Sequence, residues 1–185
     1  MNVVKIIVIF FMGFLFHTSL FSEDDLMKML VNQPFLAQSG ESLDGKALVF
    51  PDHFNLYDVT FVAYGFSRKS GDDFDSWLKP FQARYKADSN VFFISIPMIG
   101  KLPNWILKQM KKGMKKGIDV HLHAHQMVYS GNTKLYQDYY GFSNKKKGYF
   151  LLVNSEGTIV WQGQGKATDE LLKELFLMSD SFLLK

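Results

Sequence analysis

The sequence predicts an α/β protein with three layers, in which helices cover both faces of a mixed central sheet. Residues 59–66 and 91–96 are almost entirely apolar, β-branched or aromatic, which is typical of strands buried on both faces. A helical pattern separates them, so we expect two parallel strands joined by a right-handed crossover. Residues 148–153 and 158–162 predict an antiparallel hairpin, because a turn-forming Asn-Ser-Glu-Gly lies between them. Thr168 predicts the N-cap of a last helix.

The helix between the two apolar runs is expected to begin at Asp72 or Asp73, whose carboxylates are good N-caps, and to extend to about residue 87. Pro80 lies inside this helix and predicts a kink or an early end. A second helix is predicted over residues 103–116 and is expected to pack on the sheet. Its apolar positions, expected to form one stripe, are Trp105, Ile106, Met110 and Met114.

The N-terminal 22 residues predict an export signal. Residues 1–5 carry a positive charge, and residues 6–16 form an apolar run of 11 residues, which is short for a bilayer span of about 20. The alternatives are an uncleaved membrane anchor and a short apolar helix of the core. The export signal and the anchor both place the rest of the chain outside the cytoplasmic membrane, in the periplasm or anchored facing it. Residues 23–46 are then a lead-in segment, and residues 47–185 form one domain.

The composition excludes several classes of function. The chain has 185 residues and no cysteine, so dithiol redox chemistry, a cysteine nucleophile, disulfides and thiolate zinc sites are excluded. Its 21 Lys and Arg against 18 Asp and Glu give a formal charge of +3, which is too close to neutral to indicate a nucleic acid partner. A binding protein is therefore favoured over an enzyme.

The order of the predicted elements is that of the thioredoxin-like fold, and the late hairpin resembles the one that closes the sheet in the redoxin group. Within that group the chain most resembles the mitochondrial ATP synthase assembly factor family, whose members act on the membrane sector of the enzyme. The matching motifs are Leu43 to Gly45, Phe50-Pro51, Ser76-Trp77, Pro80-Phe81 and the stretch from Asn144 through Gly148-Tyr149 to Trp161, which Gly165, Ala167 and Glu170 continue. The resemblance implies a thioredoxin-like three-layer αβα sandwich with a mixed central sheet.

The resemblance also indicates where a redox site would lie. The fold usually carries Cys-x-x-Cys after the first core strand, where the N-terminus of a helix lowers the thiol pKa. This chain has Ser67, Arg68, Lys69 and Ser70 there, and Gly148 where a cis-proline is expected. We expect a degenerate loop that the serines cap and hydrate, with no catalytic residue. The alternative is an anion held by Arg68, Lys69 and the helix N-terminus.

A His-Leu-His-Ala-His sequence gives a candidate metal site. If residues 119–128 are extended, His121, His123 and His125 lie on one face of a strand, where two neighbouring imidazoles could share a zinc or copper ion. Such a site would need a further ligand from elsewhere: His53, Asp119 or Asp138. The alternatives are a surface strand with titratable imidazoles and a pH-sensitive binding edge.

Lysines are concentrated on the second predicted helix, and they are the candidate partner-binding residues Lys108, Lys111, Lys112, Lys115 and Lys116. They could contact anionic lipid or the acidic face of a membrane protein; the alternative is a solvated helix face. Residues 145–147 add a second run of lysines. Together the two clusters favour an acidic or membrane-proximal partner over a small substrate.

The sequence therefore predicts an exported, non-redox binding module without a cofactor. Its expected role is to assist assembly or maturation of a membrane-associated protein, with a protein partner and possible peripheral contact with the membrane. The alternative is a zinc- or copper-dependent protein that uses the three histidines.

Overall fold

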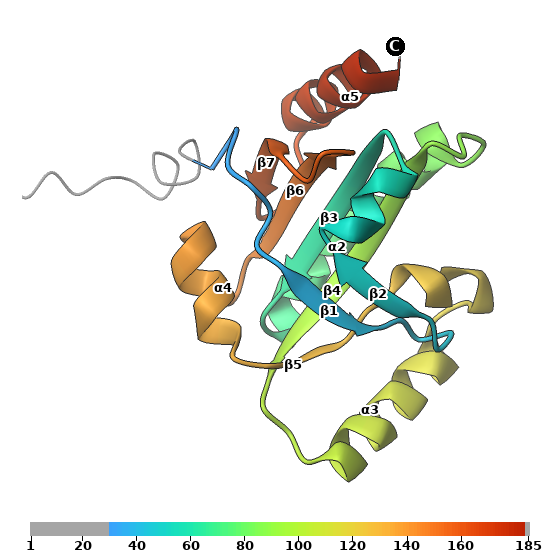
Figure 1. The fold of residues 1–185 in the computed structure, drawn as a ribbon, viewed down its shortest axis with the longest axis vertical. Coiled ribbons are helices and arrows are strands. Elements are labelled where there is room, and N and C mark those ends of the chain that lie inside the picture. The colour runs from blue at the N-terminus through green and yellow to red at the C-terminus, as the bar shows by residue number, and fades with distance from the viewer. Residues whose placement is uncertain (1–29, 184–185) are drawn as a thin grey trace, which may run out of the picture.

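The computed structural model describes residues 30–183, and the predicted signal or anchor lies outside them. A five-stranded sheet in the order β5-β4-β3-β6-β7 forms the middle of the molecule (Figure 1). Its strands are β3 (Val59–Gly65), β4 (Val91–Gly100), β5 (Tyr129–Gly131), β6 (Gly148–Asn154) and β7 (Ile159–Gln164). β4 is parallel to β3, whereas β6 is antiparallel to both β3 and β7. The predicted mixed sheet is confirmed.

The two faces of the sheet are covered by different kinds of element. Helices α2 (Arg68–Tyr85) and α5 (Asp169–Leu183) cover one face. Helix α4 (Thr133–Tyr140) and the hairpin of β1 (Gln38–Glu41) and β2 (Ala47–Phe50) cover the other. The remaining elements are the 3-10 helices η1 (Asp52–Leu56) and η2 (Val120–His125) and the helix α3 (Asn104–Gly117).

β3 is the centre of the core, and every one of its residues is buried. On the α2 side, the Phe61 ring stacks on Phe81 with 4.6 Å between centroids and lies 5.9 Å from Phe150. On the opposite side, the Tyr64 hydroxyl donates a hydrogen bond of 2.7 Å to Gln38 Oε1 in β1. Apolar side chains on both faces explain why this strand lacks the alternating pattern of a half-exposed one.

Pro80 in α2 and Pro97 in β4 do not end the elements that contain them. α2 continues past Pro80 to Tyr85 because the side chains on either side of the proline, Trp77 and Phe81, are fully buried against the sheet. β4 continues past Pro97 to Gly100. Proline is tolerated there because the pairing with β3 ends at Pro97, and the strand goes on to pair with β5.

The prediction that the second helix packs on the sheet is wrong. α3 forms over nearly the predicted residues, but it buries none of them and stands apart from the sheet (Figure 1). The helix that covers the sheet on the side opposite α2 is α4, whose Tyr136 and Tyr140 are buried in the core. Trp105 does not belong to the apolar stripe, since its side chain is 70% exposed. In the range 30–183, no helix has both the length and the apolar character needed to cross a membrane.

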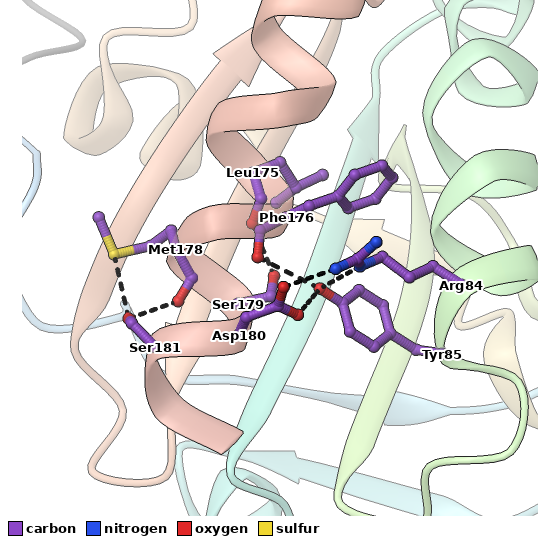
Figure 2. Close-up of polar contacts among 8 residues, drawn as sticks. All are labelled: Arg84, Tyr85, Leu175, Phe176, Met178, Ser179, Asp180 and Ser181. Atoms are coloured by element: carbon purple, nitrogen blue, oxygen red, sulfur yellow. Dashed lines mark hydrogen bonds and ion pairs between the residues drawn. The ribbon is translucent and has the colours of Figure 1, made fainter. Parts of the chain in front are cut away.

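The last turns of α2 and α5 are joined by a polar contact (Figure 2). Arg84 Nη2 donates to Asp180 Oδ2 at 2.6 Å, and the Tyr85 hydroxyl donates to Asp180 Oδ1 at 2.7 Å. The Arg84 guanidinium also lies over the Phe176 ring, 5.0 Å from its centroid. Partial burial raises the pKa of the Asp180 carboxyl. The hydrogen bonds from Arg84 and Tyr85 together lower it by more, so the pKa in the folded protein lies below the ordinary 3.8. The contact fixes the C-terminal helix onto the domain.

We expect Asp180→Asn to lower the free energy of unfolding by about 1 kcal/mol at neutral pH, because it removes a charged acceptor shared by two donors. The folded-state pKa lies below 3.8, so the unfolded chain takes up the proton first as the pH falls. The stabilisation is present above 3.8 and is lost as the pH falls through the folded-state pKa. Denaturant titrations at several pH values measure the difference between variant and wild type.

Asp75→Asn is the matched control, because Asp75 pairs with Lys79 at the surface, where both side chains are more than 70% exposed. It should change stability little. Equal losses in the two variants, or an Asp180→Asn effect that persists at the lowest pH, would contradict this interpretation.

Candidate functional site

The sequence Ser67 to Ser70 forms the first turn of α2, which begins earlier than predicted. Ser67 is the N-cap, and with Ser70 it makes a capping box: Ser70 N donates to Ser67 Oγ at 3.2 Å, and Ser67 N donates to Ser70 Oγ at 3.1 Å. Ser70 Oγ donates to the Ser67 carbonyl at 2.7 Å, and Ser67 Oγ donates to the Lys145 carbonyl at 2.8 Å. Each hydroxyl therefore has both a donor and an acceptor partner within the protein.

Asp73, one of the two predicted N-caps, has a different role. Its carboxylate is buried inside α2, and Oδ2 accepts a hydrogen bond of 2.8 Å from the Gly148 amide at the start of β6. A Cβ on Gly148 would lie 3.1 Å from the Ser70 carbonyl oxygen and 2.9 Å from the Phe150 ring. The glycine thus permits close approach of β6 to α2, and its N–H, which a proline would lack, fixes that approach.

These contacts bring two basic segments together. The Ser67–Lys145 hydrogen bond joins parts of the chain 78 residues apart and places Arg68 and Lys69 beside Lys145 and Lys146. All four side chains are exposed, and within residues 30–183 none of them forms a salt bridge. We call Arg68, Lys69, Lys145 and Lys146 the serine-turn patch. The backbone that carries these positive charges is held by the capping box of α2 and by the Ser67–Lys145 hydrogen bond.

The lysines of α3 form a separate basic surface. Lys111 is turned toward the domain and pairs with Glu41 at 3.5 Å. The other four predicted partner-binding residues are exposed and have no salt bridge to any described residue: Lys108, Lys112, Lys115 and Lys116. Because β3 and β4 are parallel, the segments that follow them leave the same end of the sheet. The serine-turn patch and the start of α3 therefore lie at one end of the molecule.

The three histidines do not share a strand face, so that prediction is wrong. They all lie in the 3-10 helix η2, where Leu122 N donates to the Asp119 carbonyl and Gln126 N donates to the His123 carbonyl. His123 is buried with Nε2 3.0 Å from the Ile118 carbonyl oxygen. No group of three or more His, Cys, Asp or Glu residues in the described part of the chain is arranged to hold a metal ion.

His125 is fixed against β4. Its Nδ1 lies 2.8 Å from the Phe93 carbonyl oxygen, and its ring stacks on Phe93 with 3.9 Å between centroids. Burial lowers the pKa of this imidazole below 6.5, which favours the neutral ring. His121 is exposed and lines, with His125, a pocket of 470 Å³ beside α2. The rings of His121 and His125 therefore lie at the edge of the sheet, beside β4.

Sequence reasoning missed the residues that close the serine turn. The Ser-x-x-Ser spacing of a capping box was a usable signal for the helix start at Arg68. The roles of Asp73 and of the Lys145 carbonyl had no local signal, since both depend on contacts between distant segments.

Solved structures similar to this chain share its fold at low sequence identity. One is a domain described as the C-terminal part of a thiol-disulfide oxidoreductase from Bacteroides thetaiotaomicron: TM-score 0.59, 15% identity, 82% of this chain and 97% of that chain covered. Another is an exposed lipoprotein thioredoxin from Streptococcus pneumoniae: TM-score 0.53, 15% identity, coverage 78% and 99%. A third is the thioredoxin domain of a Bacteroides vulgatus thiol-disulfide oxidoreductase: TM-score 0.52, 16% identity, coverage 80% and 96%. No curated protein matches the chain.

The family described as ATP10 protein matches residues 59–179, from β3 into α5. This range includes the core strands, the serine turn and most of the closing helix. The match agrees with the resemblance of the sequence to ATP synthase assembly factors, and the structural neighbours agree with the predicted thioredoxin-like fold. The chain therefore belongs to the ATP10 protein family, and it has a thioredoxin-like fold without cysteine.

Proposed function

We propose that this protein is a non-catalytic, thioredoxin-like binding module that assists assembly of a membrane-associated protein, the membrane sector of ATP synthase. Membership of the ATP10 protein family supports the assembly role. The observation that carries the non-catalytic part is the closed serine turn, in which both hydroxyls are committed to hydrogen bonds within the protein. Serine cannot replace a redox thiol, and among the described residues the two hydroxyls bond to backbone atoms and not to a side chain that could act as a base.

The serine-turn patch is the proposed contact surface for an acidic segment of the partner. Its four cations are exposed and unpaired within residues 30–183, so binding would not first require breaking ion pairs. The capping box and the Asp73–Gly148 bond fix the backbone beneath them, which reduces the entropy lost on binding. Charge complementarity of this kind favours rapid and selective encounter with an acidic partner.

We also infer that the protein acts outside the cytoplasmic membrane. The apolar run at residues 6–16 follows a positively charged start, as in export signals and short anchors. One of the similar structures is an exposed lipoprotein thioredoxin, which gives a precedent for this fold at such a location.

The charge-reversal pair Arg68→Glu/Lys69→Glu tests the contact surface. Tagged full-length protein is captured from gently solubilised membranes, and co-purifying proteins are quantified by mass spectrometry. We expect wild type to enrich subunits of the ATP synthase membrane sector, and the pair to lower this enrichment about tenfold because repulsion replaces attraction.

Lys166→Glu/Lys173→Glu is the matched control, since it changes the charge by the same amount at exposed lysines beside and within α5. It should leave the enrichment unchanged. Equal losses in both pairs would reduce the effect to net charge, and no enrichment by wild type would overturn the proposed partner.

Metal analysis of the purified protein tests the histidine hypothesis. We expect less than a tenth of an equivalent of zinc or copper per chain, on the order of background, because the ring of His123 is directed at the Ile118 carbonyl and away from a shared site. His121→Ala/His123→Ala should leave that content unchanged. A content near one ion per chain that disappears in the pair would instead establish a metal site.

A further inference from the structure

We propose that α3 lies on the surface of an anionic lipid bilayer. Trp105 and three lysines on its outward side, Lys108, Lys112 and Lys116, would contact the headgroups; we call these three the outward lysines. The inference deepens the proposed function, because it says how the protein would be held beside a membrane-embedded partner. Its evidence comes from α3 alone, so it can fail while the proposed partner stands.

α3 contributes little to the packing of the domain. None of its side chains is fully buried, and the side facing the domain is only half-buried, including Ile106, Met110 and Met114. A 14-residue helix with so little packing gains most of its stability elsewhere. α3 also stands at the outer edge of the molecule, where a flat surface could reach it (Figure 1).

Trp105 is on the side of α3 that faces away from the domain. At 100° per residue, Trp105, Lys108, Lys112 and Lys116 project within a sector of about 80°. The indole is 70% exposed, so the helix presents one large aromatic ring surrounded by flexible cations. An exposed tryptophan that the fold does not use indicates a surface made for contact.

The charge of this segment has one sign. Residues 101–118 contain six lysines and neither Asp nor Glu. Among the ion pairs of residues 30–183, Lys111 alone of these lysines is paired, with Glu41, and it is on the inner side. The outward lysines therefore keep their full attraction for an anionic surface, which a bilayer rich in acidic lipids provides along the whole length of the helix.

Lipid fits this face better than a protein does. The cores of protein interfaces are depleted in lysine and use arginine and aromatic residues packed in pockets. Helices that lie in the membrane interface combine lysines on the polar side with tryptophan at headgroup depth, because lysine stems can extend along the surface while the ammonium stays hydrated. α3 has that composition, with no arginine among residues 104–117.

The test measures sedimentation of the full-length chain with two kinds of vesicle, pure phosphatidylcholine and phosphatidylcholine with 30% phosphatidylglycerol. Any binding by the N-terminal apolar run contributes to sedimentation with both kinds of vesicle. The difference in binding between the two therefore isolates the contribution of the anionic lipid. We expect Lys108→Glu/Lys112→Glu/Lys116→Glu to lower the partition coefficient for the anionic vesicles about a hundredfold, since three attractive charges become repulsive. Binding to the neutral vesicles should not change.

Lys86→Glu/Lys166→Glu/Lys173→Glu is the matched control, with the same charge change at exposed lysines outside α3. A second variant, Trp105→Ala, should weaken anionic binding with little effect on stability because the ring is exposed. The proposal is overturned if the α3 triple variant and the control bind the anionic vesicles equally, or if wild type does not prefer them.

A third outcome separates lipid from protein. If the α3 triple variant keeps its vesicle binding but loses capture of membrane proteins in detergent, α3 binds an acidic protein and the lipid proposal is wrong. The vesicles contain no protein, so failure here leaves the capture result, which tests the proposed function, unaffected.

Discussion

The end of the molecule that carries the proposed function depends on the hydrogen bonds between the start of α2 and the segment that enters β6. Ser67 Oγ bonds to the Lys145 carbonyl, and Asp73 accepts the Gly148 amide from inside the helix. In thioredoxin-like oxidoreductases this turn carries a reactive sulfur, whereas here the hydroxyls of Ser67 and Ser70 are both hydrogen-bonded to backbone atoms. At this position the chain has a hydrogen-bonded turn that carries exposed positive charge.

The two basic surfaces differ in how the fold holds them, and this suggests different uses. The serine-turn patch lies on backbone fixed from two directions, which suits recognition of one partner in one orientation. α3 rests on a half-buried side, and the ion pair between Lys111 and Glu41 links it to the domain. Such a helix suits a surface without fixed shape, as a bilayer is. Both surfaces lie toward one end of the sheet, so contact with lipid through α3 would bring the patch close to a protein in the same membrane.

The sequence could predict elements whose pattern reports burial directly. β3 and β4 are apolar throughout because both of their faces are covered, and the hairpin and last helix follow from turn and cap residues that act locally. The start of α2 has two competing local signals, because Ser67 and Asp73 are both good caps, and the Gly148 amide that binds Asp73 is distant in the sequence. The alternation from His121 to His125 suits a strand, but the turn bonds of η2 and the stacking of His125 on β4 prevail. Which helix covers the sheet is likewise a tertiary choice, made by the tyrosines of α4.

The central claim is that the protein promotes assembly through a charged surface and without chemistry at the serine turn. The most direct measurement is the amount of assembled ATP synthase, by native gel electrophoresis, in cells lacking the gene and complemented with variants. The account predicts less assembled enzyme without the gene, recovery with wild type and with Ser67→Asn, which removes the hydroxyl but keeps a capping oxygen for Ser70 N, and no recovery with Arg68→Glu/Lys69→Glu. Normal assembly without the gene, or a Ser67→Asn protein that folds but does not restore assembly, would contradict it.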